Sequence, residues 1–371
     1  MARQWRQDRP TAWALVVHDW SALSYPKHTG KRDGMSHGSK DSRGYDLGTL
    51  LLVDGESGDP VAPLEMELRA ADEIHSTRVA AVRREDSRLD NILPAMPPLD
   101  AVVGRERVVH IIDREADSVV HYRDWQANHR CFLVRGKADR HVRWNDQTVT
   151  LADIQRQLQA QRRFQRLEPV RYRGQTAQQH VCETQVILDR PGWQGGRSRN
   201  PPRSNHRVRG PAITLRLIIS RVCDGNGQTL ATWFLLSNTP AAIPAATLAQ
   251  WYYWRWRIES FFKLLKSAGQ AVEQWQQETG AAIAKRLLVA AMACTLVWKL
   301  ERVSDPEAIR FRTFLVRLSG RQMKYGKSFT APAILAGLWV YLAMLEALEQ
   351  HTVADLQAMK QYLRLVNCDS G

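Results

Sequence analysis

The sequence is poor in cysteine and in long apolar runs, and each shortage excludes a class of protein. Its five cysteines include no C-x-x-C pair and are odd in number, so neither a zinc site nor a disulfide framework is indicated. The N-terminus has no apolar segment typical of a secretory signal. The longest apolar run, 331–345, is shorter than the ~20 residues of a membrane span. We therefore expect a cytoplasmic protein that does not enter a membrane.

Negative charge is also scarce relative to positive charge. Lys and Arg number 52 against 38 for Asp and Glu, which gives a formal net charge of +14 and a pI near 9.9. Such an excess favours a polyanionic partner, with nucleic acid as the first candidate and an anionic membrane surface as a weaker one. A soluble protein that is merely basic is the alternative. At 371 residues, the chain is long enough for one large core with an insertion.

Two apolar runs that each end in an aspartate are the clearest strand signals. The runs 13–19 and 107–113 end in Asp19 and Asp113, and each fits a buried strand that presents the carboxylate at its C-terminal edge. The other elements expected before the insertion are strands over 46–53 and 63–68 paired as a hairpin, helices over 70–89 and 115–126, and a strand over 131–134.

The middle of the chain is interpreted as an insertion, and the last part as helical. Arg- and Gln-rich segments lead to a hairpin of strands over 213–222 and 229–236, and helices are expected over 244–268, over 281–302 and in the final 70 or so residues. This order predicts an α/β, ribonuclease H-like mixed sheet with helices on its faces. The expected parts are a first core segment 1–136, a β-rich basic insertion 137–230, a second core segment 231–302 and a C-terminal helical region 303–371, for which dimerisation is one interpretation.

A third carboxylate lies in the helix expected after the insertion. The pattern Y-x2-R-x3-E-x6-K places four polar side chains at i, i+3, i+7 and i+14, namely Tyr252, Arg255, Glu259 and Lys266. On one continuous helix they form a stripe about 60° wide beside an aromatic face. The carboxylate can ligate a hard cation, and the basic side chains can hold phosphates. A solvated amphipathic helix with ion pairs such as Glu259–Lys263 is the alternative.

This pattern resembles the motif of the insertion-sequence-4 family of DDE transposases. The D-R-E-A-D segment from Asp113 and the D-W-S-A-L-S-Y segment from Asp19 are also similar to that family, so the resemblance extends from Asp19 to Gly269. It implies that Asp19, Asp113 and Glu259 are catalytic and hold two Mg²⁺ ions, for which Mn²⁺ can substitute. It further implies DNA cleavage and strand transfer, with a hairpin intermediate, by a homodimer on DNA.

The resemblance also implies a set of DNA contacts. Trp233 matches the family's tryptophan that stacks on an extruded base, although an aromatic packed in the core is the alternative. Arg135 and Lys137 lie where the family contacts DNA, as do three residues of the motif, Tyr252, Arg255 and Lys266. The Arg-rich loop 196–210, with Arg197, Arg199, Arg203, Arg207 and Arg209, either tracks a phosphate backbone or is a solvated turn.

The chain departs from the family at three places. Trp20 stands where the family usually has Thr, and Gly48 appears where a His is common. Only 18 residues precede Asp19, whereas family members normally carry an N-terminal domain that reads the transposon end. We therefore expect a truncated chain that binds DNA mainly through phosphates and inhibits an intact transposase in trans.

Two other functions stay open, and the dimer contact is a separate expectation. The first is a ribonuclease H-like nuclease that hydrolyses DNA without strand transfer, and the second is a non-catalytic DNA-binding inhibitor. Both would use the same fold. We expect the dimer contact on the apolar faces of the helices after Lys285, through Leu287, Leu288, Met292 and Trp339.

Overall fold

The chain forms two compact units. The computed structural model describes residues 1–26, 28, 30–36, 43–78, 87–194, 206–266, 269–323 and 326–364. The sheet unit comprises Met1–Phe262 with Glu273–Leu288, and the helical unit comprises Lys263–Val272 with Val289–Gly371. The four-part division expected from the sequence is finer than this and stays a prediction.

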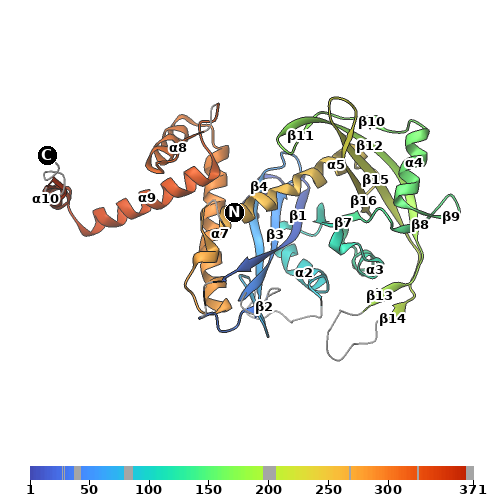
Figure 1. Ribbon diagram of the computed structural model, residues 1–371, viewed down its shortest axis with the longest axis horizontal. Helices are drawn as coiled ribbons and strands as arrows, with labels where there is room; N and C mark the ends of the chain where they lie inside the picture. Colours follow the sequence, from blue (N-terminus) through green and yellow to red (C-terminus); the bar gives the residue numbers. More distant parts are fainter. Residues whose placement is uncertain are drawn as a thin grey trace. The chain divides into compact units, whose positions relative to one another are not determined.

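A mixed β-sheet runs through the whole sheet unit (Figure 1). Its main strands are β1 Ala14–Ser24, β3 Arg43–Asp54, β4 Pro60–Arg69, β5 Ile74–Ser76, β6 Val108–Ile112, β7 Cys131–Gly136, β8 His141–Trp144, β9 Gln147–Thr150, β12 Gln175–Leu188, β15 Ile213–Cys223 and β16 Thr229–Ser237. They lie in the order β5-β4-β3-β1-β6-β7-β16-β15-β12-β8-β9. Only the β1–β6 and β6–β7 pairings in this order are parallel. The insertion strands therefore continue the core sheet.

Short strands complete the sheet unit. They are β2 Met35–Ser36, which pairs with β3, β10 Gln165–Arg166 and β11 Val170–Tyr172, which pair with β12, and a separate pair of β13 Gly192–Gln194 with β14 His206–Val208. Each pairing is antiparallel.

The central strands of the sheet are apolar on both faces, and helices pack against them. Every residue of β6 is buried, as expected for a parallel strand covered on both sides. Three helices, α2 Ile92–Val103, α3 Val119–Ala127 and α4 Leu151–Ala160, contribute to one core cluster with these strands. A second cluster joins α2 to β1, β3 and β4, with α1 Ala2–Asp8 packed against it. The α/β, ribonuclease H-like fold predicted from the sequence is confirmed.

Two local predictions before the insertion need correction, and one helix was not predicted. Strand β1 does not end at Asp19 but continues to Ser24. The helix expected over 70–89 is wrong, because β5 lies within it, and 79–86 lie outside the described residues. Helix α2 was not expected, since Pro97 and Pro98 lie in its interior and proline removes helical hydrogen bonds. Burial of one apolar face of α2 outweighs this cost.

The helix expected over 244–268 is two helices. Helix α5 covers Ala245–Trp254 and α6 covers Trp256–Leu265, with Arg255 at the break between them. The Arg255 N–H donates to the Tyr252 carbonyl at 3.2 Å, and the Ile258 N–H donates to the Arg255 carbonyl at 3.1 Å. These three-residue bonds tighten the chain into a short 3₁₀ turn.

The C-terminal region is helical, as predicted. Helices α7 Gly280–Arg302, α8 Pro306–Leu318, α9 Ala331–Gln350 and α10 Val353–Arg364 follow the short turn η2 Val272–Gln274. Within the helical unit α8 packs on α9 at Gly337, where an added Cβ would lie 1.8 Å from the Leu315 carbonyl oxygen. Glycine is needed there because the two backbones approach so closely.

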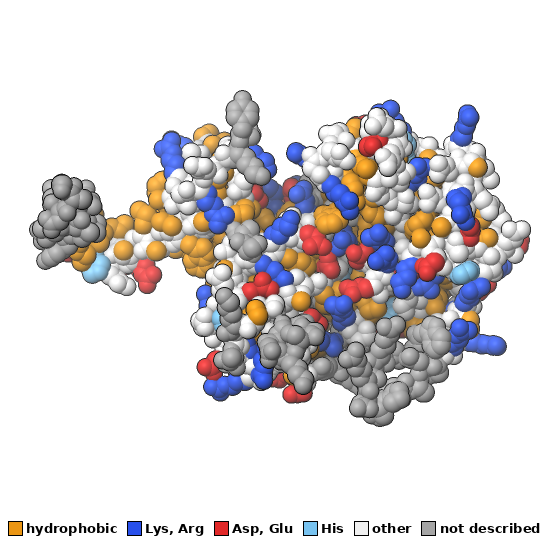
Figure 2. All heavy atoms as spheres, in the orientation of Figure 1, with side chains coloured by type: hydrophobic (Ala, Val, Ile, Leu, Met, Phe, Trp, Pro, Cys, Tyr) orange, Lys and Arg blue, Asp and Glu red, His pale blue; other side chains and the backbone are white. Residues whose placement is uncertain are grey.

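Two of these helices are apolar enough to span a bilayer by length and composition alone. They are α7 and α9, whose most apolar 18-residue segments are 56% and 28% buried, respectively. Apolar side chains follow the length of α9 in Figure 2. Core helices of soluble proteins pass the same test, so the expected absence of a membrane contact stays a prediction.

Candidate active site

Strand register places the first two carboxylates side by side. The parallel pairing of β1 with β6 runs from Ala14 opposite Val108 to His18 opposite Ile112, and the next residue on each strand is Asp19 or Asp113. The parallel pairing ends at His18, whereas strand β1 continues to Ser24. Both side chains therefore lie at the carboxyl ends of parallel pairing, the usual place for ligands in such sheets.

Helix α6 carries the third carboxylate, Glu259, to the same point. Arg255 is 4% exposed, and its Nη1 lies 2.7 Å from Asp19 Oδ2 and 3.9 Å from Glu259 Oε1. Its Nη2 lies 3.5 Å from Asp113 Oδ2. One guanidinium thus joins three carboxylates that are far apart in the sequence. In Figure 2, acidic side chains lie among Lys and Arg over the middle of the sheet unit.

Asp113 is held in its ionised form. Burial alone would raise its pKa, but Arg255 and the Arg114 N–H, which donates to Oδ1 at 2.6 Å, lower it. The Tyr252 hydroxyl donates to Oδ1 at 3.0 Å, and Arg135 Nη1 lies 3.6 Å from the same oxygen. The net effect is a pKa below the ordinary value. Tyr252 and Arg135 therefore contact Asp113, and the DNA contacts expected of both residues stay predictions.

Asp19 differs from Asp113 in its ionisation. Its side chain is 14% exposed, and burial raises its pKa to about 6. Arg255 and the Trp20 N–H, which donates to Oδ1 at 2.8 Å, act in the opposite direction, while the charges of Glu259 and Asp113 raise the pKa further. Near neutral pH, Asp19 is therefore protonated more easily than Asp113.

The donor set suits a hard divalent cation. Carboxylate oxygens are the ligands that Mg²⁺ and Mn²⁺ prefer in proteins, and all three acids already share the charge of one cation, Arg255. Their ligand atoms do not all lie within 4.8 Å of one another, whereas the Arg255 guanidinium contacts all three. Arg255 thus stands where positive charge is required.

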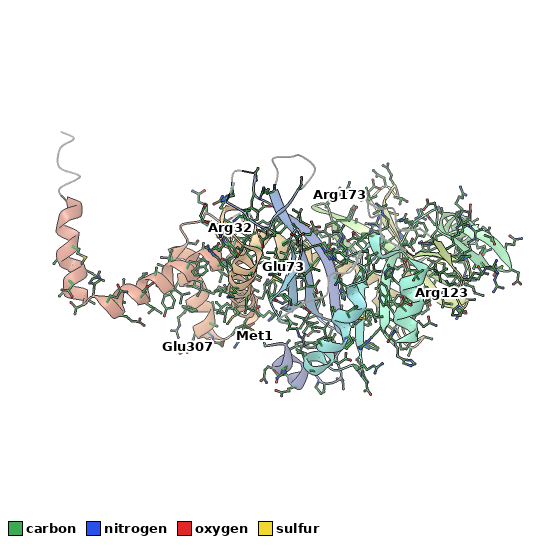
Figure 3. The ribbon with its side chains drawn as sticks, turned by 90° about the horizontal axis from the view of Figure 1, so that it is seen from below. Met1, Arg32, Glu73, Arg123, Arg173 and Glu307 are labelled. Atoms are coloured by element: carbon green, nitrogen blue, oxygen red, sulfur yellow. The ribbon has the colours of Figure 1, made fainter. Side chains whose placement is uncertain are left out.

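A different group in the described part of the chain meets that distance. It consists of Asp33, Glu73 and His75, and Glu73 is labelled in Figure 3. The His75 Nε2 lies 3.4 Å from a carboxylate oxygen of each acid. The Asp33 carboxylate also accepts the Tyr45 hydroxyl at 2.6 Å and the Gly280 N–H at 2.8 Å. This group has the spacing that a metal site needs.

The two residues that depart from the family pattern, Trp20 and Gly48, pack against each other. Trp20 and Gly48 are directly opposite in the β1–β3 register, and an added Cβ at Gly48 would lie 3.1 Å from Trp20 Nε1. The indole therefore occupies the space that a side chain at position 48 would need. The Arg88 guanidinium lies over the same indole at 5.3 Å. Neither change removes a carboxylate.

Trp233 lies in the core rather than at an open surface. It is 4% exposed, and its ring lies between Tyr172 at 6.2 Å and Tyr252 at 5.7 Å. This geometry fits the alternative of a packed strand aromatic. Stacking of an extruded base on Trp233 stays a prediction.

An open aromatic groove lies nearby and was missed in the sequence. Its volume is about 420 Å³, and its lining combines aromatic and basic side chains: Arg171, Tyr172, Arg173, Tyr253, Trp254, Trp256, Arg257 and Ser260. Trp256 is 48% exposed, and the Arg255 guanidinium lies 5.4 Å from its ring. The aromatic run at 251–256 is the signal that would have indicated it.

The remaining predicted residues have mixed outcomes. Leu287 is fully buried, so the expectation that it forms an exposed dimer contact is wrong, whereas Leu288, Met292 and Trp339 are 45%, 60% and 44% exposed. Lys266 belongs to the helical unit, and its DNA contact stays a prediction. Three of the loop arginines, Arg197, Arg199 and Arg203, lie outside the described residues.

The chain matches the model of a known protein family. A family model described as a transposase DDE domain matches residues 14–296. This span contains Asp19, Asp113 and Glu259, the Arg255 break and the whole insertion.

Proposed function

Because the chain belongs to the transposase DDE domain family, we propose that it cuts and rejoins DNA with Asp19, Asp113 and Glu259 as metal ligands. The observation that carries this is the convergence of the three carboxylates on Arg255. Within the family, the Y-R-E-K residues favour the insertion-sequence-4 group. A plain nuclease would need the same acids but no joining step.

The chain's own residues prepare the site for phosphodiester chemistry. When bound, two Mg²⁺ or Mn²⁺ ions would activate an attacking water or 3′-hydroxyl and stabilise the leaving oxygen. Asp113 enters the reaction ionised and is oriented by the Tyr252 hydroxyl. Arg255 exchanges carboxylate oxygens for phosphate oxygens as DNA enters, since its planar fork suits both.

A hairpin intermediate needs room for a base outside the helix. We place that base in the aromatic groove, because Trp256 offers an exposed ring and bases stack on such rings without sequence preference. Arg171, Arg173 and Arg257 line the same groove and can neutralise the phosphates of a sharply bent strand.

The deciding experiment compares Glu259→Gln with wild type on a duplex and a hairpin-ended duplex in Mn²⁺. We expect cleavage to disappear while DNA affinity is unchanged or slightly raised, because the substitution removes a ligand and a negative charge beside the phosphates. Cleavage by Glu259→Gln at the wild-type rate would contradict the proposal, and Glu115 and Asp117 would be tested next.

Two matched variants separate the site from other acids. Glu106→Gln changes an exposed glutamate before β6, and His75→Gln removes a ligand from the second acidic group. Both should cleave as wild type does. Loss of cleavage in His75→Gln would place the required metal at that group instead. Joining of a 3′-hydroxyl end into plasmid DNA distinguishes a transposase from a nuclease.

A further inference from the structure

A histidine and two acids meet at the edge of the sheet that ends in β5. They are Asp33, which precedes β2, Glu73, which precedes β5, and His75 within β5. One ligand atom from each lies within 4.8 Å of the other two. We propose that these three side chains bind a divalent transition-metal ion such as Zn²⁺ at a structural site that shares no ligand with the proposed active site.

The spacing of the ligand atoms is that of a tetrahedral ion. His75 Nε2 lies 3.4 Å from Asp33 Oδ2 and 3.4 Å from Glu73 Oε1. Zinc holds nitrogen and oxygen ligands at about 2.0–2.1 Å in tetrahedral geometry, so two of its ligands lie roughly 3.3–3.4 Å apart. Hydrogen bonds from N–H to oxygen are shorter, at about 2.7–3.2 Å. The observed distances therefore fit ligands around an ion better than a hydrogen-bonded histidine.

His75 Nε2 lacks the partner that a buried nitrogen needs. The atom is buried and forms no hydrogen bond within the described residues, although it faces two carboxylate oxygens. Buried polar atoms are normally paired, and each exception calls for an explanation. A neutral imidazole with its proton on Nδ1 offers a lone pair at Nε2. An ion between this nitrogen and the two carboxylates would satisfy all three groups.

A glycine keeps open the space between two of the ligands. At Gly280, the first residue of α7, an added Cβ would lie 2.5 Å from His75 Cδ2, 2.8 Å from His75 Nε2 and 3.2 Å from Asp33 Oδ2. Gly280 is not among the glycines with positive φ, so its backbone conformation does not demand glycine. Close approach to the two ligands is the reason that a larger residue would not fit.

Asp33 is held in the orientation and charge state that a ligand needs. The Tyr45 hydroxyl donates to its Oδ1 at 2.6 Å, and the Gly280 N–H donates to its Oδ2 at 2.8 Å. Burial alone would raise the pKa of Asp33, but these hydrogen bonds lower it. Carboxylates that ligate metals are commonly fixed by such hydrogen bonds. Asp33 is therefore ionised and oriented before an ion binds.

The local charge and the donor atoms favour a transition metal. Lys31 and Arg32, which precede Asp33, are engaged elsewhere, because Lys31 Nζ donates to the Trp275 carbonyl at 2.7 Å and Arg32 pairs with Glu278 at 2.5 Å. Mg²⁺ and Ca²⁺ prefer oxygen ligands alone, whereas imidazole suits zinc and its neighbours. The cysteine pattern gave no sign of this site, because none of its ligands is a thiol.

An ion at this site would join three parts of the sheet unit. Asp33 belongs to the segment before β2, Glu73 and His75 belong to the β4–β5 hairpin, and Gly280 begins α7. Strand β5 has three residues and lies at the end of the strand order, so it has few contacts of its own. An ion that binds the folded chain and not the unfolded chain stabilises the fold.

The test uses the full chain with Asp19→Asn and Glu259→Gln as the parent, so that the proposed active site does not compete for metal. After treatment with EDTA, Zn²⁺ binding is measured by calorimetric titration, and the Tm is measured with and without Zn²⁺. Co²⁺ serves as a spectroscopic probe, because its visible absorption is stronger in tetrahedral than in octahedral surroundings.

Two ligand variants are each compared with a matched control in this parent. His75→Gln is compared with His141→Gln, which changes an exposed histidine of β8. Glu73→Gln is compared with Glu106→Gln, and both glutamates are exposed. Because Glu73 is exposed, its variant should fold even if His75→Gln does not.

We expect one Zn²⁺ per parent chain, and a rise in Tm of roughly 5 °C when free Zn²⁺ is about 100-fold above its dissociation constant. Each ligand variant should weaken Zn²⁺ binding by more than about 10-fold, since loss of even a residue that supports a ligand costs about 10–100-fold. The controls should bind as the parent does.

Equal Zn²⁺ affinity in the parent and in Glu73→Gln would overturn the inference, as would a parent whose Tm does not rise with Zn²⁺. The three side chains would then form only ion pairs with one another. Failure of the wild-type chain to cleave DNA in Mn²⁺, with Zn²⁺ binding intact, would count against the proposed function alone.

Discussion

We expect metal-dependent cleavage to fall as the pH drops through about 6, because Asp19 then takes up a proton. Burial raises the pKa of this carboxyl to about 6, and a protonated carboxyl is a poor ligand for a divalent cation. Asp113 should not limit the reaction in this range, because its pKa lies below the ordinary value. The acid limb of the pH profile should therefore report one group.

The size of the effect follows from that pKa. Asp19 is about 99% ionised at pH 8 and roughly 10% ionised at pH 5. At subsaturating Mn²⁺ the cleavage rate should thus fall about ten-fold between these two pH values. Because metal and proton compete for the same oxygens, each ten-fold rise in Mn²⁺ above its dissociation constant should move the midpoint of the profile down by about one pH unit.

The assay measures initial cleavage rates of a hairpin-ended duplex from pH 5 to 8 at several Mn²⁺ concentrations. The affinity of Glu259→Gln for the same duplex, measured over the same pH range, corrects for any change in DNA binding. A profile that is flat down to pH 5, or whose midpoint does not move with metal concentration, would refute the reasoning.

Three further predictions concern packing. Gly48→Ala should lower the free energy of unfolding by roughly 1–3 kcal/mol, because the added methyl group would contact Trp20. The same substitution should cost less in a Trp20→Thr background, which a double-mutant cycle in urea would measure. Equal costs in the two backgrounds would show that the two positions are not coupled. Trp233→Ala should lower the free energy of unfolding by about 3–5 kcal/mol, because that ring is buried. Trp256→Ala should leave the Tm nearly unchanged and reduce hairpin formation. The opposite pattern would indicate that the extruded base stacks on Trp233. Gly337→Ala should lower the Tm by several degrees, because its Cβ would collide with the α8 backbone, and a calorimetric scan without such a shift would show that the two helices can separate slightly at no cost.

The two aspartates could be identified from the sequence because a local pattern marks each of them. An apolar run that ends in a carboxylate is visible in a short window, and both Asp19 and Asp113 follow such runs. Their adjacency depends on parallel register between strands separated by about 90 residues. The pattern predicted that they would meet, but not that β1 continues past the meeting point.

Other features depend on contacts that no local pattern encodes. The break at Arg255 lies inside a run that favours one continuous helix, and ion pairs with distant strands accompany it. The α2 prolines argue against a helix locally, whereas the buried apolar face appears only in the folded unit. Trp20 and Gly48 lie 28 positions apart in sequence, and only the strand register reveals that one explains the other.

The guanidinium among the three acids also bears on how the protein is made. Three carboxylates gathered in a partly buried site repel one another, and such a cluster normally awaits an external cation before it can assemble. Here Arg255 is part of the chain and offsets part of the negative charge of the cluster. We therefore expect the three acids to assemble in the folded chain without a bound metal ion.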